Sequence, residues 1–307
     1  MPVPQLPPPR MQRARVLVTG ANGHLGRRLL NVLANTRDTV AVVRSEAARR
    51  TLPQLEHGEQ RVLDYTDAGA LQDAMQECAA VVHLVGIINT SRANSFELAH
   101  EATCRALARA AAGAGVQRIV YLSIVGARSD STNACLASKG RAEDILLAGS
   151  VPALILRLPM VLGEGDYASR ALGKRARAAR AFGFRMQSLE QPIYAGDVVQ
   201  AIANALNISL NEGTVLELAG PESLTRAALT QRAAKVLGLR GPAVVSLPLA
   251  LGKTIALALE CALNAPPISR AMLGVLDHDD AIDAARACAQ LDIALTPLDD
   301  MLRLVLT

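Results

Sequence analysis

The stretch VLVTGANGHLGRRLL, residues 16–30, limits the possible folds more than any other part of the chain. It places three glycines directly after a hydrophobic strand pattern and at the start of a helical pattern. Glycines in this context allow a tight turn, close approach of the backbone to a pyrophosphate, and close packing of the helix on the strand. The first helical turn also offers free N–H groups to an anion. We therefore predict a dinucleotide site here, with a ligand-free glycine turn as the alternative; its residues are Gly20, Asn22, Gly23, His24, Leu25 and Gly26.

The first half of the chain repeats an alternation of strand and helix patterns. Helical patterns such as 24–36 and 96–115 separate apolar runs of strand length, which lie at 15–20, 39–43, 61–64, 80–86, 118–123 and 153–159. A repeated strand–helix pattern of this length indicates a parallel sheet with helices on both faces. We therefore predict an α/β fold: a Rossmann-type, doubly wound parallel sheet with a small, mostly helical C-terminal lobe.

The same patterns divide the chain into three parts. Prolines dominate residues 1–13, for which we expect a flexible tail. Residues 14–160 are predicted to form the NAD(P)-binding Rossmann domain. Residues 161–307, which have a strand pattern at 214–220 and a helix around 223–237, are expected to form the small lobe, interleaved with the last strands of the sheet.

Composition excludes several classes of function. Half of the residues are hydrophobic but only 2% are aromatic, so the core must consist mainly of Ala, Val, Leu and Ile. A net charge of +4 and few aromatic rings argue against nucleic-acid binding. The five cysteines are scattered without a CxxC pair, and no histidine has a metal-ligand spacing, so we predict a reduced, cytoplasmic compartment and no metal site. The first residues also lack the apolar core of a secretory signal.

The end of the second strand pattern bears on the choice of cofactor. Arg44 stands there, and no carboxylate follows until Glu46. Since a cation suits a 2′-phosphate and a carboxylate suits a ribose diol, the sequence favours NADP(H) over NAD(H), with a solvated Arg44 as the alternative. Asp64, after the third strand pattern, is expected to meet the adenine, and Gly86 to let the backbone pass close to the cofactor.

Two stretches of the second half raise the question of a membrane or a charged ligand. Residues 243–263 have the length of a span but contain charges at Lys253 and Glu260, so we predict an amphipathic helix. It either docks on its own domain, forms a surface for a membrane or a partner, or spans a bilayer. In residues 169–185, Arg170, Lys174 and Arg177 share a helical face that is either solvated or binds an anionic substrate or lipid headgroup.

Several motifs resemble those of the short-chain dehydrogenase/reductase superfamily, in its extended and atypical branch. Over residues 14–220 they follow the family's order: TGANGHLG, VLDYTD, VVHLVG, VYLSIVGA, SKGRAE and LRLPMVLGEGD. Over nearly the whole chain, the sequence is most similar to the group typified by the nucleotide-binding accessory subunit of mitochondrial complex I and its bacterial relatives. The motifs of that group are VVHLVGI, LSIVGA, QPIYAGDVVQAI, LELAGPESLT, LPLALGK with APPISRAML, and LDIALTPLDDMLR.

The resemblance implies roles for individual residues. In the superfamily a tyrosine four residues before a lysine exchanges the substrate proton, the lysine holds the nicotinamide ribose, and a serine orients the substrate. The lysine is Lys139, the candidate serine is Ser123, and Cys135 occupies the position of the tyrosine. Pro159 resembles the residue whose backbone meets the nicotinamide, and Asp197 is expected to cap the helix that follows it.

Cys135 leaves three possibilities open. It is a small buried residue without a catalytic role, it belongs to a site that takes its proton from elsewhere or from water, or it is a catalytic or redox thiol. Tyr167 and Tyr194 are the candidates for a replacement tyrosine.

The predicted function follows from these alternatives, and whether the protein is an enzyme stays open. The first hypothesis is an NAD(P)H-binding structural, assembly or regulatory protein linked to respiratory complex I or quinone metabolism, with a respiratory or membrane-associated partner and a peripheral position at the inner membrane. The alternative is an active NADPH-dependent reductase, epimerase or dehydratase on a small carbonyl or sugar-nucleotide substrate. A third possibility is a sensor of the NADPH/NADP ratio.

Overall fold

The fold was analysed in a computed structural model of the chain. The structure describes residues 14–91, 94–264, 266 and 268–307. The tail predicted at 1–13 lies outside the described residues.

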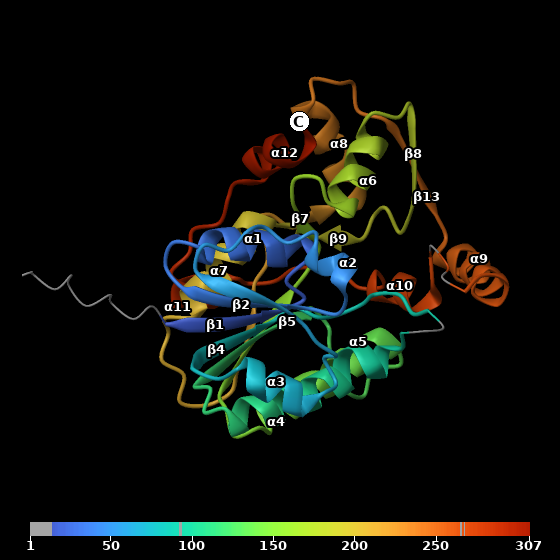
Figure 1. Ribbon diagram of the computed structural model, residues 1–307. Coiled ribbons are helices and arrows are strands. Elements are labelled where there is room, and N and C mark those ends of the chain that lie inside the picture. Colours follow the sequence, from blue (N-terminus) through green and yellow to red (C-terminus); the bar gives the residue numbers. More distant parts are fainter. Residues whose placement is uncertain (1–13, 92–93, 265, 267) are drawn as a thin grey trace, which may run out of the picture.

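A seven-stranded parallel sheet forms the centre of the molecule (Figure 1). Its strands run in the order β3-β2-β1-β4-β5-β6-β11, so the sequence order of the strands reverses between β1 and β4. This order confirms the predicted doubly wound sheet and creates a crevice at the carboxyl ends of β1 and β4, where such folds bind their ligands. The strand bounds are β1 Arg15–Thr19, β2 Asp38–Val43, β3 Gly58–Val62, β4 Cys78–His83, β5 Arg118–Ile124, β6 Ala153–Leu158 and β11 Thr214–Glu217.

Helices cover both faces of this sheet. Along β1, Val16 and Val18 point to one face and Leu17 to the other, and all three are buried. A strand that is buried on both faces has a continuous apolar sequence, so β1 could be predicted from the sequence. On the face of Val16 lie α1 (His24–Leu33), α7 (Ala195–Ala205) and α11 (Ala285–Leu291); on the other lie α3 (Ala68–Ala74), α4 (Thr103–Gly113) and α5 (Ala134–Leu147) (Figure 1).

The predicted helix at 96–115 is not α-helical throughout. Its first part is a π-helical segment, η1, at Glu97–Ala102, which continues directly into α4. Single π-turns inside helices occur often at functional sites. Here the segment places His100 in the interior with no exposed surface.

The smaller lobe lies beyond α1 and α7 (Figure 1). Its core consists of apolar residues from three helices, among them Leu172, Leu229 and Met301. The helices are α6 (Tyr167–Ala176), α8 (Arg226–Val236) and α12 (Leu298–Leu306). Three two-stranded sheets accompany them: β7 (Val161–Leu162) with β10 (Ile193–Tyr194), β9 (Leu189–Glu190) with β12 (Leu224–Thr225), and β8 (Arg180–Phe184) with β13 (Ala243–Leu247).

The prediction of one helix over residues 243–263 is wrong in its first part. Residues 243–247 form strand β13, because Val244 and Val245 extend in parallel pairing with β8. Pro248 then starts α9 (Leu249–Ala262), which is followed by α10 (Arg270–Val275). No helix within the described parts of the chain is long and apolar enough to cross a membrane.

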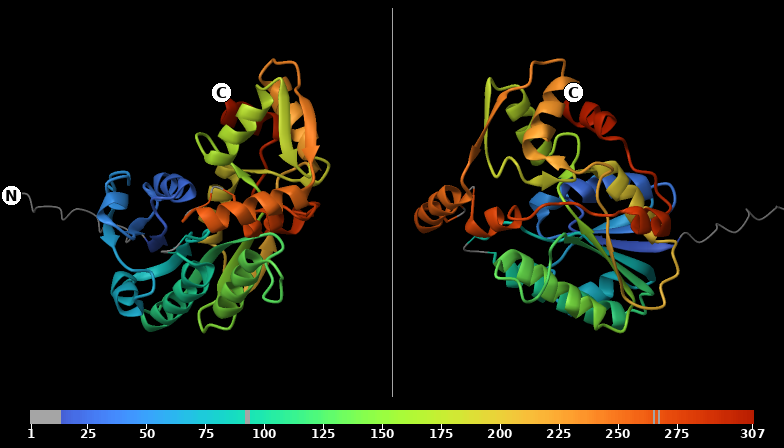
Figure 2. Two further views of the ribbon diagram at one scale, coloured as in Figure 1. Left: turned by 90° about the vertical axis from the view of Figure 1, so that its right-hand side faces the viewer. Right: turned by 180° about the vertical axis from the view of Figure 1, so that it is seen from behind.

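Helix α9 docks by its small residues and leaves its large ones exposed. Gly252 and Ala256 are buried, and a Cβ atom at Gly252 would lie 2.8 Å from the ring of Phe184. Leu251 and Ile255, on another side of the helix, are 48% and 44% exposed. Figures 1 and 2 show α9 at the periphery of the molecule, with one side away from the rest of the chain.

Two further predictions about single residues are tested by the structure. Asp197 does not cap α7, because that helix already begins at Ala195; its carboxylate instead accepts hydrogen bonds from the backbone and hydroxyl of Thr296. In the predicted basic face, Arg170 and Lys174 of α6 and Arg177 at its end are all exposed, and Arg177 also donates to the carbonyl oxygen of Leu306.

Candidate functional site

The glycine loop after β1 has the geometry that a pyrophosphate needs. Gly20 has φ +68°, a conformation that favours glycine. A Cβ atom at Gly26 would lie 2.6 Å from the carbonyl oxygens of Gly20 and Ala21, so only glycine lets α1 approach the loop so closely. Gly23 precedes α1 and no side chain caps this end of the helix, which leaves the first N–H groups free for an anion. The loop therefore fits the phosphates of a dinucleotide.

Tyr65 supports the glycine loop through two hydrogen bonds that the sequence does not predict. Its hydroxyl accepts a hydrogen bond from the N–H of Gly20 at 3.0 Å and donates one to the carbonyl oxygen of Val42 at 3.0 Å. Tyr65 thereby ties the glycine loop to β2. A tyrosine directly after the predicted third strand was the available signal, but its partners depend on the strand order.

The residues expected at the adenosine end lie at the tips of β2 and β3. Arg44 follows β2 and is exposed. Asp64 follows β3, and one of its oxygens accepts the N–H and the hydroxyl of Thr66, which lowers the pKa of this carboxyl group. Both side chains are therefore exposed just beyond the carboxyl ends of neighbouring strands.

His24 and Arg28 connect the start of α1 to the small lobe. His24 Nε2 lies 3.9 Å from a carboxylate oxygen of Asp166, and burial and the charge of Arg28 lower the pKa of this histidine. Arg28 forms an ion pair of 2.5 Å with Glu164, which also accepts the hydroxyl of Tyr194 at 2.5 Å. Tyr194 thus belongs to this contact, and burial raises its pKa to about 12.

Lys139 lies under the carboxyl end of β4 and β5. Its ammonium group donates to the hydroxyl of Tyr121 at 2.9 Å and to the carbonyl oxygen of Leu122 at 2.8 Å. Burial lowers the pKa of Lys139 to about 8. A Cβ atom at Gly86 would lie 2.9 Å from Nζ, so a larger residue there would displace the ammonium group.

Cys135 is fully buried in the first turn of α5. Its thiol donates to the carbonyl oxygen of Ile87 at 3.7 Å, and burial raises its pKa to about 11. His100 contacts the same residue, since its Nε2 accepts the N–H of Ile87 at 3.0 Å. Cys135 therefore helps to fix the backbone after β4, and its proton is directed away from solvent.

Ser123 is also turned into the interior. Its hydroxyl donates to Glu143, whose carboxylate forms a double contact with Arg157, the shorter at 2.6 Å. Ser123 is 3% exposed, so this geometry gives it a structural bond rather than a free hydroxyl. Pro159 follows β6 at the same edge of the sheet and is half-buried.

Replacing Cys135 by tyrosine is expected to destabilise the protein rather than restore a proton donor. The side chain has no exposed surface, so the added ring overpacks the interior by about 1–3 kcal/mol of unfolding free energy. Thermal unfolding of Cys135→Tyr measures this loss. Cys261→Tyr, at an exposed cysteine, is the control and should unfold like the wild type. An unchanged midpoint for Cys135→Tyr would contradict the buried position.

A cavity of about 820 Å³ opens beside the amino end of α5. Neither Tyr167 nor Tyr194 lines it, and Tyr167 is 72% exposed on α6. Its lining includes apolar groups such as Phe96 and Leu136 together with many polar ones: Thr90, Arg128, Ser131, Thr132, Asn133, Lys253, Glu260, Arg270, Asp277 and His278. A cavity of this size and lining suits a small molecule with several polar atoms. The part of the chain that the structure describes contains no group of His, Cys, Asp and Glu side chains suited to a metal ion.

The fold and the glycine loop define a dinucleotide-binding protein of the doubly wound class. A family model described as NAD(P)H-binding matches residues 20–191, more than half of the chain. The chain belongs to this NAD(P)H-binding family.

Relatives with similar sequences include subunits of respiratory complex I. The mitochondrial "NADH dehydrogenase [ubiquinone] 1 alpha subcomplex subunit 9" of Arabidopsis thaliana is 29% identical over 81% of this chain and 64% of its own length. The mitochondrial "NADH-ubiquinone oxidoreductase 40 kDa subunit" of Neurospora crassa is 27% identical over 92% of this chain and 75% of its own. "Ceramide reductase" of Caulobacter vibrioides is 33% identical over 55% and 52%. The chain thus spans less than two thirds of the plant and Caulobacter proteins.

Solved structures confirm the fold. The protein described as gox2253 superimposes with a TM-score of 0.74 at 22% identity, over 95% of this chain and 97% of that one. MoeE5 in complex with UDP-glucuronic acid and NAD has a TM-score of 0.70 at 20% identity, over 95% and 98%. About 95% of the chain therefore follows the architecture of these proteins.

Proposed function

We propose that this protein binds NADP(H) and serves as an accessory, assembly or regulatory component linked to respiratory complex I or quinone metabolism. The observation that carries the proposal is the pair Lys139 and Cys135: the lysine of the cofactor site is retained, while the proton-donor position holds a buried thiol that bonds to Ile87. The complex I subunits among the relatives support the respiratory link.

The proposed cofactor site runs along the carboxyl edge of the sheet. The N–H groups at the start of α1 hold the pyrophosphate. Arg44 and Asp64 bind the adenosine end, and Gly86, Lys139 and Pro159 face the nicotinamide half. The phosphate contacts come from the glycine loop: Gly20, Asn22, Gly23, His24, Leu25 and Gly26. The bound nicotinamide would supply redox chemistry, while Lys139 would hold and orient the ribose.

The preference for NADP(H) depends on Arg44. Its exposed guanidinium follows β2, where a 2′-phosphate would add a charge-assisted contact of about 1.5–3 kcal/mol. Arg44→Asp should therefore weaken NADPH binding about tenfold or more without weakening NADH binding, because the new carboxylate suits the ribose diol of NADH; calorimetric titration measures both affinities. Arg50→Asp, at the end of the short helix after Arg44, is the control. Equal losses for both cofactors would contradict the role of Arg44.

We also propose that α9 contacts a membrane surface. Leu251 and Ile255, one turn apart, form its exposed apolar side, while Lys253 and Glu260 line the cavity. Flotation with phosphatidylcholine and phosphatidylglycerol vesicles should recover the wild type, and the double variant Leu251→Glu with Ile255→Glu should lose most of this binding. Leu304→Glu, at an exposed leucine of α12, is the control. A wild type that stays unbound would contradict the membrane contact.

A second candidate function is an NADPH-dependent reductase acting on a small carbonyl compound. The specific observation is the cavity of about 820 Å³ beside the amino end of α5, which can hold such a substrate. The name of the Caulobacter relative also supports a reductase. NADPH oxidation in the presence of carbonyl compounds tests this function.

A further inference from the structure

A carbonyl reduction in this cavity needs a proton donor, and the residues expected from the sequence do not provide one. The thiol of Cys135 has no exposed surface and donates to Ile87. Ser123 donates to Glu143 in the interior. Tyr167 and Tyr194 lie outside the cavity lining. The proton must therefore come from another residue that faces the cavity or from water.

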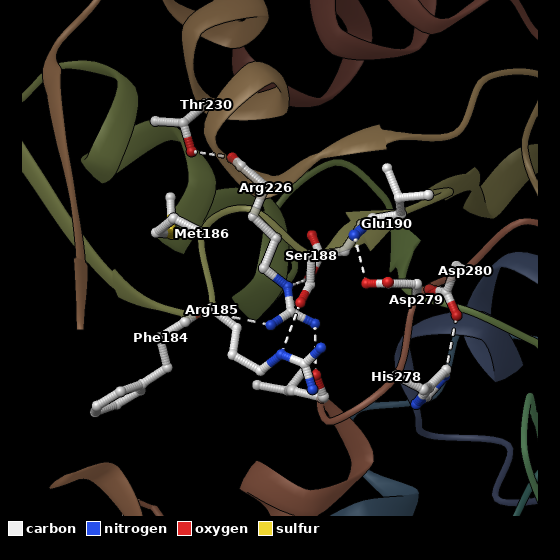
Figure 3. A network of polar contacts seen from close by, with 12 residues as sticks. Phe184, Arg185, Met186, Ser188, Glu190, Arg226, Thr230, His278, Asp279 and Asp280 are labelled. Atoms are coloured by element: carbon white, nitrogen blue, oxygen red, sulfur yellow. Dashed lines mark hydrogen bonds and ion pairs between the residues drawn. The ribbon is translucent and has the colours of Figure 1, made fainter. Parts of the chain in front are cut away.

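His278 lines the cavity from the segment that follows α10. Its Nε2 lies 3.0 Å from a carboxylate oxygen of Asp280, and its side chain keeps 34% of its surface exposed (Figure 3). A histidine held by a carboxylate is a common acid–base pair, because the carboxylate orients the ring and stabilises its charged form. Among the described lining residues His278 is the only imidazole.

The backbone around Asp280 is fixed to the small lobe, so the pair has a defined position. The N–H of Asp280 donates to the carbonyl oxygen of Leu189 at 3.2 Å, and the N–H of Leu189 donates to a carboxylate oxygen of Asp279 at 2.9 Å. The hydroxyl of Ser223 donates to the carbonyl oxygen of Asp280. These contacts hold the segment against β9 and β12, next to the buried ion pair of Arg226 and Glu190 (Figure 3).

We propose that the His278–Asp280 pair is the proton donor for carbonyl reduction in this cavity, in the place of the missing tyrosine. The inference rests on the second candidate function. Reduction of a carbonyl adds a hydride to carbon and a proton to oxygen. Bound NADPH supplies the hydride with both electrons and leaves as NADP⁺. The imidazolium of His278 gives its proton to the carbonyl oxygen, and neutral His278 takes up one H⁺ from the solvent, so each turnover consumes one H⁺.

The charges around His278 are consistent with this role. The contact with Asp280 raises the pKa of His278, against the opposing effects of burial and of Arg226, and Asp279 adds a smaller increase. The other charged side chains of the cavity lining are largely paired with oppositely charged neighbours, so their effects on the pKa of the imidazole partly cancel. The pairs are Lys253 with Asp277 at 3.3 Å, Arg270 with Glu260 at 2.8 Å, and Arg128 with Asp130 at 3.2 Å.

The test uses the full chain, NADPH and the aromatic diketone benzil as the carbonyl probe. His278→Gln should slow NADPH oxidation about a hundredfold, because a positioned general acid contributes that much or more. Its affinity for NADPH should equal that of the wild type. The matched control is His57→Gln, at an exposed histidine in the loop before β3, which should react like the wild type.

A second readout does not depend on turnover. In NMR titrations of the protein without cofactor, the imidazole of His278 should titrate above the usual value of about 6.5 and return toward it in Asp280→Asn. An unchanged rate in His278→Gln, or an imidazole that titrates below that value, would overturn the inference while leaving the reductase function intact. A wild type that binds NADPH but reduces no benzil would overturn the reductase function and this inference together.

Discussion

Gly26→Ala is expected to remove most of the NADPH affinity and to destabilise the fold. The added Cβ atom would lie 2.6 Å from two carbonyl oxygens of the glycine loop, and backbone atoms cannot move aside as a flexible side chain can. Overpacking of this kind costs about 1–3 kcal/mol of unfolding free energy. Because the same backbone would hold the pyrophosphate, we expect the NADPH affinity to fall about tenfold or more.

The control for this variant is Gly69→Ala. Gly69 lies in the first turn of α3, where a Cβ atom would meet nothing closer than 3.4 Å, so the substitution should leave NADPH binding unchanged. Denaturant unfolding and calorimetric titration of both variants separate the two effects. If Gly26→Ala binds NADPH within about twofold of the wild type and unfolds at the same midpoint, the close approach of α1 to the loop is not required.

Lys139→Met is expected to weaken NADPH binding while keeping the fold. Methionine has a similar length and fills the same interior space, but it cannot donate to Tyr121, Leu122 or a ribose hydroxyl. Hydrogen bonds from a charged group contribute about 1.5–3 kcal/mol, so the affinity should fall by about tenfold to a hundredfold. Calorimetric titration with NADPH measures this change.

The pH dependence of stability gives an independent readout for Lys139. Burial holds its pKa in the folded protein at about 8, below its ordinary value of 10.5. Between these pH values the unfolded chain keeps a proton that the folded protein has released. The contribution of Lys139 to the free energy of unfolding therefore rises with pH across this window, by about 3 kcal/mol in total.

Lys139→Met lacks this rise, so the free energy of unfolding of the wild type minus that of the variant should increase from pH 8 to pH 10.5. Taking the difference removes the effect of the groups titrating in this pH window that do not interact with Lys139. Lys174→Met, at an exposed lysine of α6, should show no such increase. A flat difference for Lys139→Met would mean that the ammonium group is solvated in the folded protein.

Most of the central sheet could be predicted from the sequence because its strands are buried on both faces. Strands such as β1 and β5 read as continuous runs of branched and apolar residues, and glycine loops have few alternative explanations in that context. The small lobe was harder. In residues 243–263 the apolar residues fit both a strand and a helix, and only the pairing of β13 with β8 decides between them.

The candidate site shows the same division. The positions of Gly20, Gly26 and Lys139 follow from local sequence motifs. The partners of Ser123 and Cys135 do not, because Glu143 and Ile87 come from other elements and meet these side chains only in the folded sheet. No sequence motif identifies His278, because a carboxylate two residues later forms no recognisable pattern. Its cavity is also assembled from several separate segments of the chain.

Calorimetric titration of the wild-type chain with NADPH and with NADH tests the account most directly. The glycine loop and the free amino end of α1 predict saturable binding of one NADPH per chain, and Arg44 predicts tighter binding of NADPH than of NADH. Absence of saturable binding of either cofactor would contradict the proposed cofactor site, and tighter binding of NADH would contradict the role assigned to Arg44.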